Sequence, residues 1–128
     1  MKSFKKGILA LGLTLGIIAS VGGAAFAGSF SHGFIKNFII TANSSINSDK
    51  ASAYTLYDDV GVAEVSSAYY YVNPTTFYSG RMIKQHGQFK YAHVEFIAPK
   101  NHQSLAIQSS HKLAAHGQKW TGSTEAKR

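Results

Sequence analysis

The strongest constraint on the fold is a two-residue alternation in the middle of the chain. Residues 62–72, VAEVSSAYYYV, and residues 88–98, QFKYAHVEFIA, both alternate in this way. Successive side chains of a β-strand point to opposite faces of its sheet, so both ranges are predicted as strands. Asn73-Pro74 ends the first and Pro99 ends the second. In the first strand, one face is predicted to hold Ala63, Val65, Ser67, Tyr69 and Tyr71.

The rest of the chain divides into short segments of the same kind. Residues 33–42, GFIKNFIITA, fit one face of a helix as well as a strand, and the abundance of Phe, Ile and Thr favours the strand. Residues 110–117 are the segment where a short helix is the strongest alternative, with Ser110 as its cap and Gly117 as its end.

About six or seven short strands separated by turn residues predict an all-β fold, a small antiparallel β-sandwich or a small barrel. We expect one secreted β-rich domain over residues 28–121 and a flexible tail over residues 122–128.

The first 27 residues have the three parts of a secretory signal. Lys2, Lys5 and Lys6 precede an uncharged run over residues 7–27, which ends in the triplet Ala25-Phe26-Ala27. We predict a cut after Ala27 that leaves no membrane span. A retained anchor is the alternative, because the run is long enough to cross a bilayer, although its glycines make it only moderately apolar. The chain has no cysteine, which favours a protein secreted by, or associated with the wall of, a Gram-positive bacterium.

Positive charge points to the cell envelope as the partner. Without the three leader lysines, the chain has 10 Lys and Arg against 6 Asp and Glu, a formal net charge of +4, and it keeps all six histidines. An ordinary histidine titrates near pH ~6.5, so mild acid would raise the positive charge. Such a domain is attracted to anionic wall polymers, lipid head groups or lipid-linked pyrophosphates. The alternative is that the charge only keeps the protein soluble.

Catalytic and metal-binding patterns are scarce. The sequence has no G-x-S-x-G elbow, no H-E-x-x-H motif and no cysteine nucleophile. Asp58 and Asp59 are adjacent in a predicted turn, where neighbouring side chains point apart. We therefore predict no enzyme activity, no catalytic residues, no cofactor and no metal. Nucleic acid is also not expected as a partner of an exported protein, although residues 78–96 interleave aromatic and basic residues.

Tyrosines with nearby cations are the candidate binding surface. On a strand, the middle tyrosine of the 69–71 run faces away from its two neighbours, so one side is expected in the core and the other exposed. The alternative is that these are ordinary strand tyrosines. The candidate surface-binding residues are Tyr69, Tyr70, Tyr71, Tyr78, Arg81 and Lys84.

After the predicted cut the chain begins GSFSHGF, residues 28–34, with a Gly, a small hydroxyl residue and an aromatic before His32-Gly33-Phe34. This resembles the mature N-terminus of the cysteine-free lactococcin family of secreted bacteriocins, and residues 65–71, VSSAYYY, are similar to a Ser- and Tyr-rich strand of that family. Phe30 stands where the family has tryptophan, and residues 35–59 separate the two motifs. The resemblance implies an exported antiparallel β-sandwich that binds a lipid-linked cell-wall precursor of competing bacteria.

Two functional hypotheses follow. The first is a secreted, antimicrobial, bacteriocin-like protein that acts by binding a cell-wall precursor or an anionic envelope component. The second is a wall- or matrix-associated structural or binding protein without antibacterial activity.

The predicted cut can be tested on the secreted product. Mass spectrometry of culture medium should find a chain that starts at Gly28, because the small residues at 25 and 27 suit a signal peptidase. A full-length, membrane-retained chain as the main product would contradict this prediction.

Overall fold

The computed structural model describes residues 27–128, and within them every regular element is a β-strand. The predicted leader lies outside the described residues apart from Ala27. The strands are β1 (Ala27–Ile35), β2 (Phe38–Ile46), β3 (Lys50–Tyr57), β4 (Val62–Val72), β5 (Ser79–Phe89), β6 (Tyr91–Ile97), β7 (Gln103–Ala115) and β8 (Gln118–Lys127).

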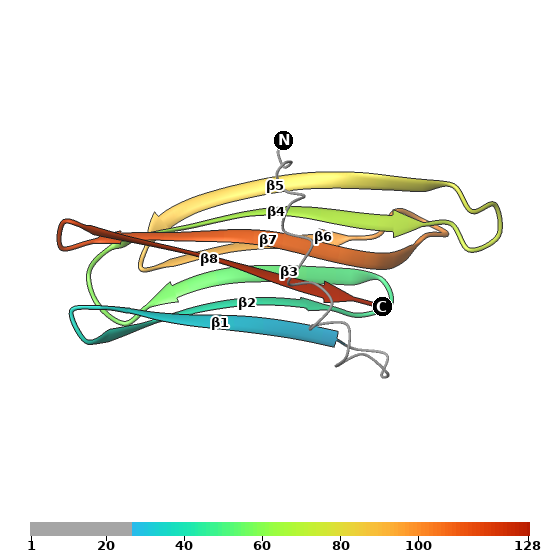
Figure 1. Ribbon diagram of the computed structural model, residues 1–128. Helices are drawn as coiled ribbons and strands as arrows, with labels where there is room; N and C mark the ends of the chain where they lie inside the picture. The colour runs from blue at the N-terminus through green and yellow to red at the C-terminus, as the bar shows by residue number, and fades with distance from the viewer. Residues whose placement is uncertain (1–26) are drawn as a thin grey trace.

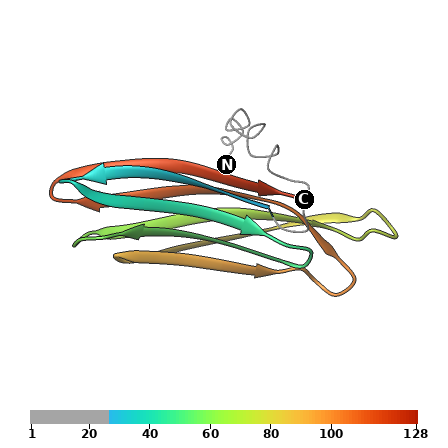
Figure 2. The same cartoon turned by 90° about the horizontal axis from the view of Figure 1, so that it is seen from below.

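The strands form two antiparallel four-stranded sheets packed face to face (Figures 1 and 2). The first sheet has the order β1-β2-β3-β6 and the second has the order β5-β4-β7-β8. The sheets stay separate, so the predicted all-β sandwich is confirmed and the fold is not a closed barrel. Strand β4 coincides with the predicted range 62–72, and its inner face carries the small and aromatic set that the alternation assigned to it.

Tight turns at non-glycine residues connect the strands. Lys36 and Asn37 have φ values of 53° and 66°, which gives the β1–β2 hairpin a two-residue turn whose twist suits the flanking strands. Lys90 has a φ of 67°, and there the chain leaves β5 and enters β6 in the other sheet. The predicted single strand over 88–98 is therefore divided at Lys90, because the left-handed residue breaks the extended run.

Near the C-terminus, the predicted flexible tail is wrong, and the helical alternative is not what forms. Residues up to Lys127 belong to β8, and residues 110–115 continue β7. In both cases pairing decides the structure: β7 lies between β4 and β8, and its residues Leu113 and Ala115 are buried. Likewise, Thr124 and Ala126 of β8 are buried. Tertiary burial thus overrides the local helix and tail signals.

The space between the sheets is filled by one apolar cluster with polar side chains at its centre. Ile40 and Ile46 lie on the inner face of β2 with Ser44 between them, and the two isoleucines are about 20 Å apart along the strand. The end of the cluster near Ile40 contains Ile35, Tyr57, Leu113 and Trp120, and the end near Ile46 contains Tyr69, Phe96 and Ile107.

Gly33 is required where β1 crosses the tryptophan of β8. A Cβ atom at Gly33 would lie 2.1 Å from Nε1 of Trp120, and one at Gly122 would lie 2.5 Å from the far edge of the same ring. The indole therefore fills the space that these two glycines leave. This contact closes the β1–β8 side of the sandwich. Packing therefore explains the glycine at position 33 of the N-terminal GSFSHGF motif.

Substitution of Gly33 should destabilise the fold. We expect Gly33→Ala to lower the free energy of unfolding by about 1–3 kcal/mol, because the methyl group displaces Trp120, and to lower Tm by roughly 4–8 °C per kcal/mol. Denaturant unfolding followed by Trp120 fluorescence measures this. Gly87→Ala is the matched control, since a Cβ at Gly87 makes only an ordinary contact at 3.4 Å with Glu64. Equal stability of the two variants would contradict the packing argument.

Candidate functional site

The outer face of the first sheet carries an array of exposed aromatic and imidazole rings. The inward-facing positions of β1 are Ser29, Ser31, Gly33 and Ile35, so the alternate residues face solvent. Phe30 and Phe34 are 60% and 64% exposed. We call this surface the aromatic face, and it consists of Phe30, His32 and Phe34 on β1, Tyr54 on β3, and Tyr91 and His93 on β6.

Strand register arranges these rings in rows that run across all four strands. Neighbouring strands are about 4.8 Å apart, so each row is about 14 Å wide, and the next row lies about 7 Å further along the strands. Polar side chains of β2 lie between the rings in both rows. The first row is Phe30, Asn43, Tyr54 and His93, and the second is His32, Thr41, Leu56 and Tyr91.

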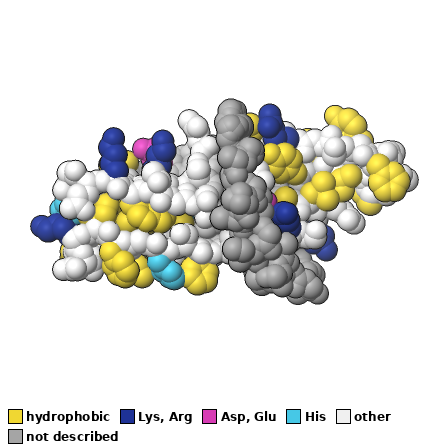
Figure 3. Space-filling model, in the orientation of Figure 1, with side chains coloured by type: hydrophobic (Ala, Val, Ile, Leu, Met, Phe, Trp, Pro, Cys, Tyr) yellow, Lys and Arg dark blue, Asp and Glu magenta, His cyan; other side chains and the backbone are white. Residues whose placement is uncertain are grey.

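Ring contacts make part of this surface flat. The rings of Tyr91 and His93 are stacked at 13° with centroids 5.9 Å apart, and Tyr54 lies 5.8 Å from Tyr91. At the other edge, Phe30 and His32 make an edge-to-face pair at 4.8 Å. Figure 3 shows hydrophobic side chains with a histidine between them along the lower edge, over β1. The face therefore presents flat apolar rings together with amide, hydroxyl and imidazole groups.

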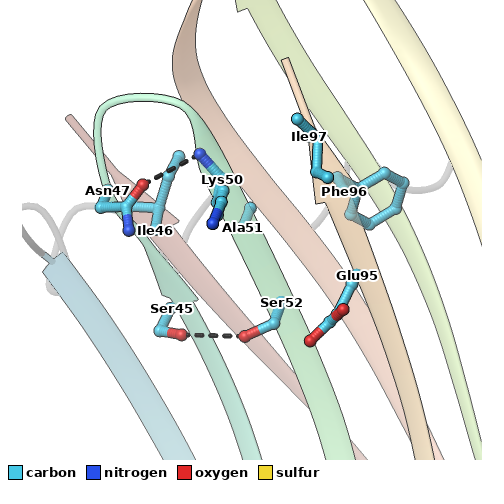
Figure 4. Close-up of a pocket in the computed structure, with 9 residues that line it drawn as sticks. All are labelled: Ser45, Ile46, Asn47, Lys50, Ala51, Ser52, Glu95, Phe96 and Ile97. Atoms are coloured by element: carbon cyan, nitrogen blue, oxygen red, sulfur yellow. Dashed lines mark hydrogen bonds between the residues drawn. The ribbon is translucent and has the colours of Figure 1, made fainter.

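A shallow hollow of about 260 Å³ adjoins the aromatic face. Part of its polar lining is the next row of the sheet, in which Ser45, Ser52 and Glu95 are register partners, and Asn47 and Lys50 also line it (Figure 4). The hydroxyls of Ser45 and Ser52 are 3.1 Å apart and hydrogen-bonded. At this size the hollow is smaller than the usual site for a small molecule, roughly 300–1,000 Å³. It extends the aromatic face as a polar end and does not enclose a ligand by itself.

Charges on this surface are few. Nε2 of His93 lies 3.5 Å from a carboxylate oxygen of Glu95. Partial burial raises the pKa of Tyr91, and the neighbouring Tyr54 and Glu95 raise it further, so the phenol of Tyr91 stays neutral and can donate a hydrogen bond over the whole physiological range. The face therefore offers ring contacts and neutral hydrogen bonds more than ion pairs.

The structure does not gather the predicted binding residues into one surface. Tyr69 is fully buried, stacks on Phe96 at 5.1 Å and is hydrogen-bonded to Ser104, so its assignment to a binding surface is wrong. The Lys84 ammonium donates to the carbonyl of Glu95 and lies over the Phe96 ring, which makes it a contact between the sheets.

The other four predicted residues lie on two different parts of the molecule. Tyr70 and Arg81 are cross-strand partners on the outer face of the second sheet. Tyr71 is half-buried at one end of the sandwich, where Tyr78 is exposed in the loop after β4.

Sequence reasoning missed the aromatic face, although a signal for it was present. GSFSHGF alternates small inner residues with ring-bearing outer residues at Phe30, His32 and Phe34, as a strand with one buried face should. The partners on β3 and β6 could not be identified from the alternation, because it does not specify which strands pair. Their placement beside β1 and β2 needs the sheet order.

A network of hydrogen bonds joins the two sheets in the polar centre. His111 Nδ1 is 2.8 Å from the hydroxyl of Thr55, and its Nε2 is 2.7 Å from the hydroxyl of Thr124. Thr55 also donates to the carbonyl of Glu64. From Thr124 the network continues through the hydroxyls of Ser44, Ser109 and Ser67.

This network has the groups of a nucleophilic site but no access to solvent. A hydroxyl on an imidazole is the first element of serine-type catalysis, yet His111 is 0% exposed and Thr124 is 5% exposed. The network therefore fixes the position of one sheet on the other. Burial lowers the pKa of His111 from 6.5 to about 4, so the ring is neutral at physiological pH.

Other ionisable groups are dispersed over the described part of the chain. Asp59 accepts a hydrogen bond of 2.8 Å from His116, which lowers the pKa of this carboxyl. Among residues 27–128, no three His, Asp or Glu side chains are grouped so that they could hold a metal ion. The same residues contain no helix long and apolar enough to cross a membrane.

Comparison with known proteins gives no relative. No protein family, no curated protein and no solved structure matches the chain.

Burial of His111 should make the fold sensitive to acid. An unfolded histidine takes up a proton near pH 6.5, whereas folded His111 takes it up only near pH 4. The unfolded state therefore binds more protons between these values, and the free energy of unfolding falls by up to ~3 kcal/mol as pH decreases from 6.5 to 4.

Denaturant unfolding at several pH values measures this loss. His111→Gln should be less stable at pH 7 but should lose less stability on acidification than the native chain. His32→Gln, at an exposed position on the outer face of β1, is the matched control and should lose as much stability on acidification as the native chain. Parallel pH curves for His111→Gln and the native chain would contradict the assignment.

Proposed function

We propose that this chain is a secreted protein of bacteriocin type that acts by binding a component of the bacterial envelope and not by catalysis. The observation that supports the proposal is the aromatic face, where six exposed or half-buried rings are held on rigid strands. Large exposed apolar surfaces on soluble proteins generally mark interaction sites. A cell-wall glycan or a lipid-linked wall precursor is the expected ligand class.

The chemistry of the aromatic face suits a sugar chain. Pyranose rings have flat faces of C–H groups that pack on aromatic rings, and their hydroxyl and N-acetyl groups need neutral hydrogen-bond partners. Asn43 and Thr41 lie between the rings and supply such partners. The row through Ser45, Ser52 and Glu95 adds hydroxyl and carboxylate acceptors at one end. A surface this wide and open fits a polymer better than an enclosed small molecule.

The second hypothesis, a wall- or matrix-associated protein without antibacterial activity, uses the same face. The two differ in consequence: a bacteriocin stops growth of related bacteria, and free lipid-linked precursor relieves that inhibition. A spot test of purified protein, with and without added precursor, separates them. Adsorption to walls without inhibition supports the second hypothesis.

Sedimentation with purified cell walls tests the binding face itself. We expect Phe30→Ala to weaken binding by roughly tenfold, because an exposed ring that stacks on a ligand contributes about this much. Phe89→Ala is the matched control, since Phe89 is 58% exposed on the outer face of the second sheet, against 60% for Phe30. Its effect should stay within about twofold, which is the usual range for a surface change outside a site.

Salt and pH separate ring-driven binding from electrostatic attraction. Binding through the aromatic face should change little with added salt or between neutral and mildly acidic pH, because the face carries few charges. Binding that strengthens in acid, weakens in salt and is equal in Phe30→Ala and Phe89→Ala would instead show that the net positive charge carries the interaction.

A further inference from the structure

The loop between β4 and β5 carries the most exposed large apolar side chains of the described residues. Phe77 is 79% exposed and Tyr78 is 66% exposed. In both ribbon views this loop extends beyond the end of the sandwich (Figures 1 and 2), and hydrophobic side chains gather on it in the space-filling view (Figure 3). We call residues 73–78 the aromatic tip.

Hydrogen bonds make the aromatic tip rigid. The side-chain oxygen of Asn73 accepts from the backbone N–H groups of Thr75 and Thr76. The backbone of Asn73 accepts from the N–H of Phe77 at 2.7 Å and donates to the carbonyl of Tyr78 at 2.8 Å. The tip therefore holds its two rings in fixed positions, and little conformational entropy is lost when they bind.

Phe77 is held in an unfavourable backbone conformation. Its φ is 61°, a left-handed value that is rare and strained for a bulky residue. Burial of its ring does not offset this strain, since the ring is largely exposed to water. Strained residues that fold stability does not explain are typical of functional loops.

The base of the aromatic tip is anchored and positively charged. His102, in the loop after β6, makes edge-to-face contacts with Tyr71 and Tyr78 at 5.4 and 6.2 Å, which joins the two loops. Lys100, two residues before His102, and Arg81, three residues after Tyr78, are both exposed. The two loops, residues 73–78 and 98–102, contain no carboxylate.

We propose that the aromatic tip docks on the surface of a lipid bilayer that contains anionic head groups. Phenylalanine and tyrosine rings favour the boundary between head groups and acyl chains, and Arg81 and Lys100 then lie at the depth of the lipid phosphates. A bilayer accommodates two protruding rings without a matching pocket, whereas a protein partner would need one. This site is separate from the aromatic face and does not depend on the proposed function.

Vesicle sedimentation tests the proposal with purified protein and two lipid compositions, phosphatidylcholine alone and phosphatidylcholine mixed with phosphatidylglycerol. We expect binding to the mixed vesicles and weaker binding to the neutral ones. Phe77→Ala should reduce binding to the mixed vesicles by roughly tenfold, because burial of one phenylalanine ring contributes about that factor. Phe89→Ala removes another exposed phenylalanine ring, 58% exposed and far from the tip, and should bind as the native chain does.

Fluorescence gives a second readout at the same position. In Phe77→Trp, the added indole should shift its emission to shorter wavelength when mixed vesicles are present. Trp120 is at the opposite end of the sandwich, beside Gly33, so the native chain should show no such shift. Phe77→Ala should keep the native Tm, which shows that any loss of binding is not a loss of fold.

Three outcomes would overturn the proposal. The native protein could bind neither kind of vesicle, Phe77→Ala could bind them as well as the native chain does, or Phe77→Trp could show no shift of its emission. A Phe77→Ala variant that loses wall binding and not vesicle binding would assign the tip to the wall polymer. Failure of Phe30→Ala in the wall assay would leave this proposal intact, because the two assays use different surfaces.

Discussion

The fold depends on hydrogen bonds buried between its two sheets. Six polar side chains, from Ser67 through Ser109, Ser44, Thr124 and His111 to Thr55, form one connected network at the centre. A buried polar group without a partner is costly, so a one-residue slip of one sheet on the other would separate the three pairs that cross between them, Ser44–Ser109, Ser44–Thr124 and Thr55–His111. The network thus specifies the alignment of the sheets in a chain without a disulfide, while the larger apolar side chains pack toward both ends of the core.

Small residues face inward along β1, and the large rings of this strand lie on the outer face of the sheet. The inner positions of β1 are Ser29, Ser31, Gly33 and Ile35, and of these only Ile35 adds a large apolar side chain to the core. The large rings of β1 are instead on the outer face, where folding gains little from them. The N-terminal motif therefore contributes to packing through Gly33 against Trp120, and its exposed rings leave an apolar outer surface, which is the surface proposed for binding.

The sequence predicts strands better than it predicts their partners. The β4 range and both of its faces follow from the alternation alone, because every second residue is small or aromatic and inward. The alternation over 88–98 gave no warning of the turn at Lys90, since a left-handed conformation at lysine has no sequence signature comparable to glycine. The alternation shows which residues share a face with Tyr69, but it does not show which of the two faces is buried. For this reason Tyr69 was predicted as a surface residue. The aromatic face was missed for the same reason: it joins residues of β1 to residues of β6 that are 60 positions away in the chain, and only the sheet order brings them together.

The sheet edges bear on the choice between a discrete binding protein and a structural assembly. An exposed edge strand is a template for pairing with another copy of the chain. Here, side chains of each sheet form hydrogen bonds with backbone groups on an edge strand of the other sheet. On β6, the N–H of His93 donates to His86, and the carbonyl of Glu95 accepts from Lys84. On β8, the N–H of Glu125 donates to Ser29. These contacts block parts of β6 and β8 from edge-to-edge addition. Addition of a strand to β6 or β8 at these points would have to break them, whereas binding through an outer face or a loop leaves them in place. At these two of the four sheet edges, the native fold therefore opposes the strand addition that a polymerising matrix protein would use.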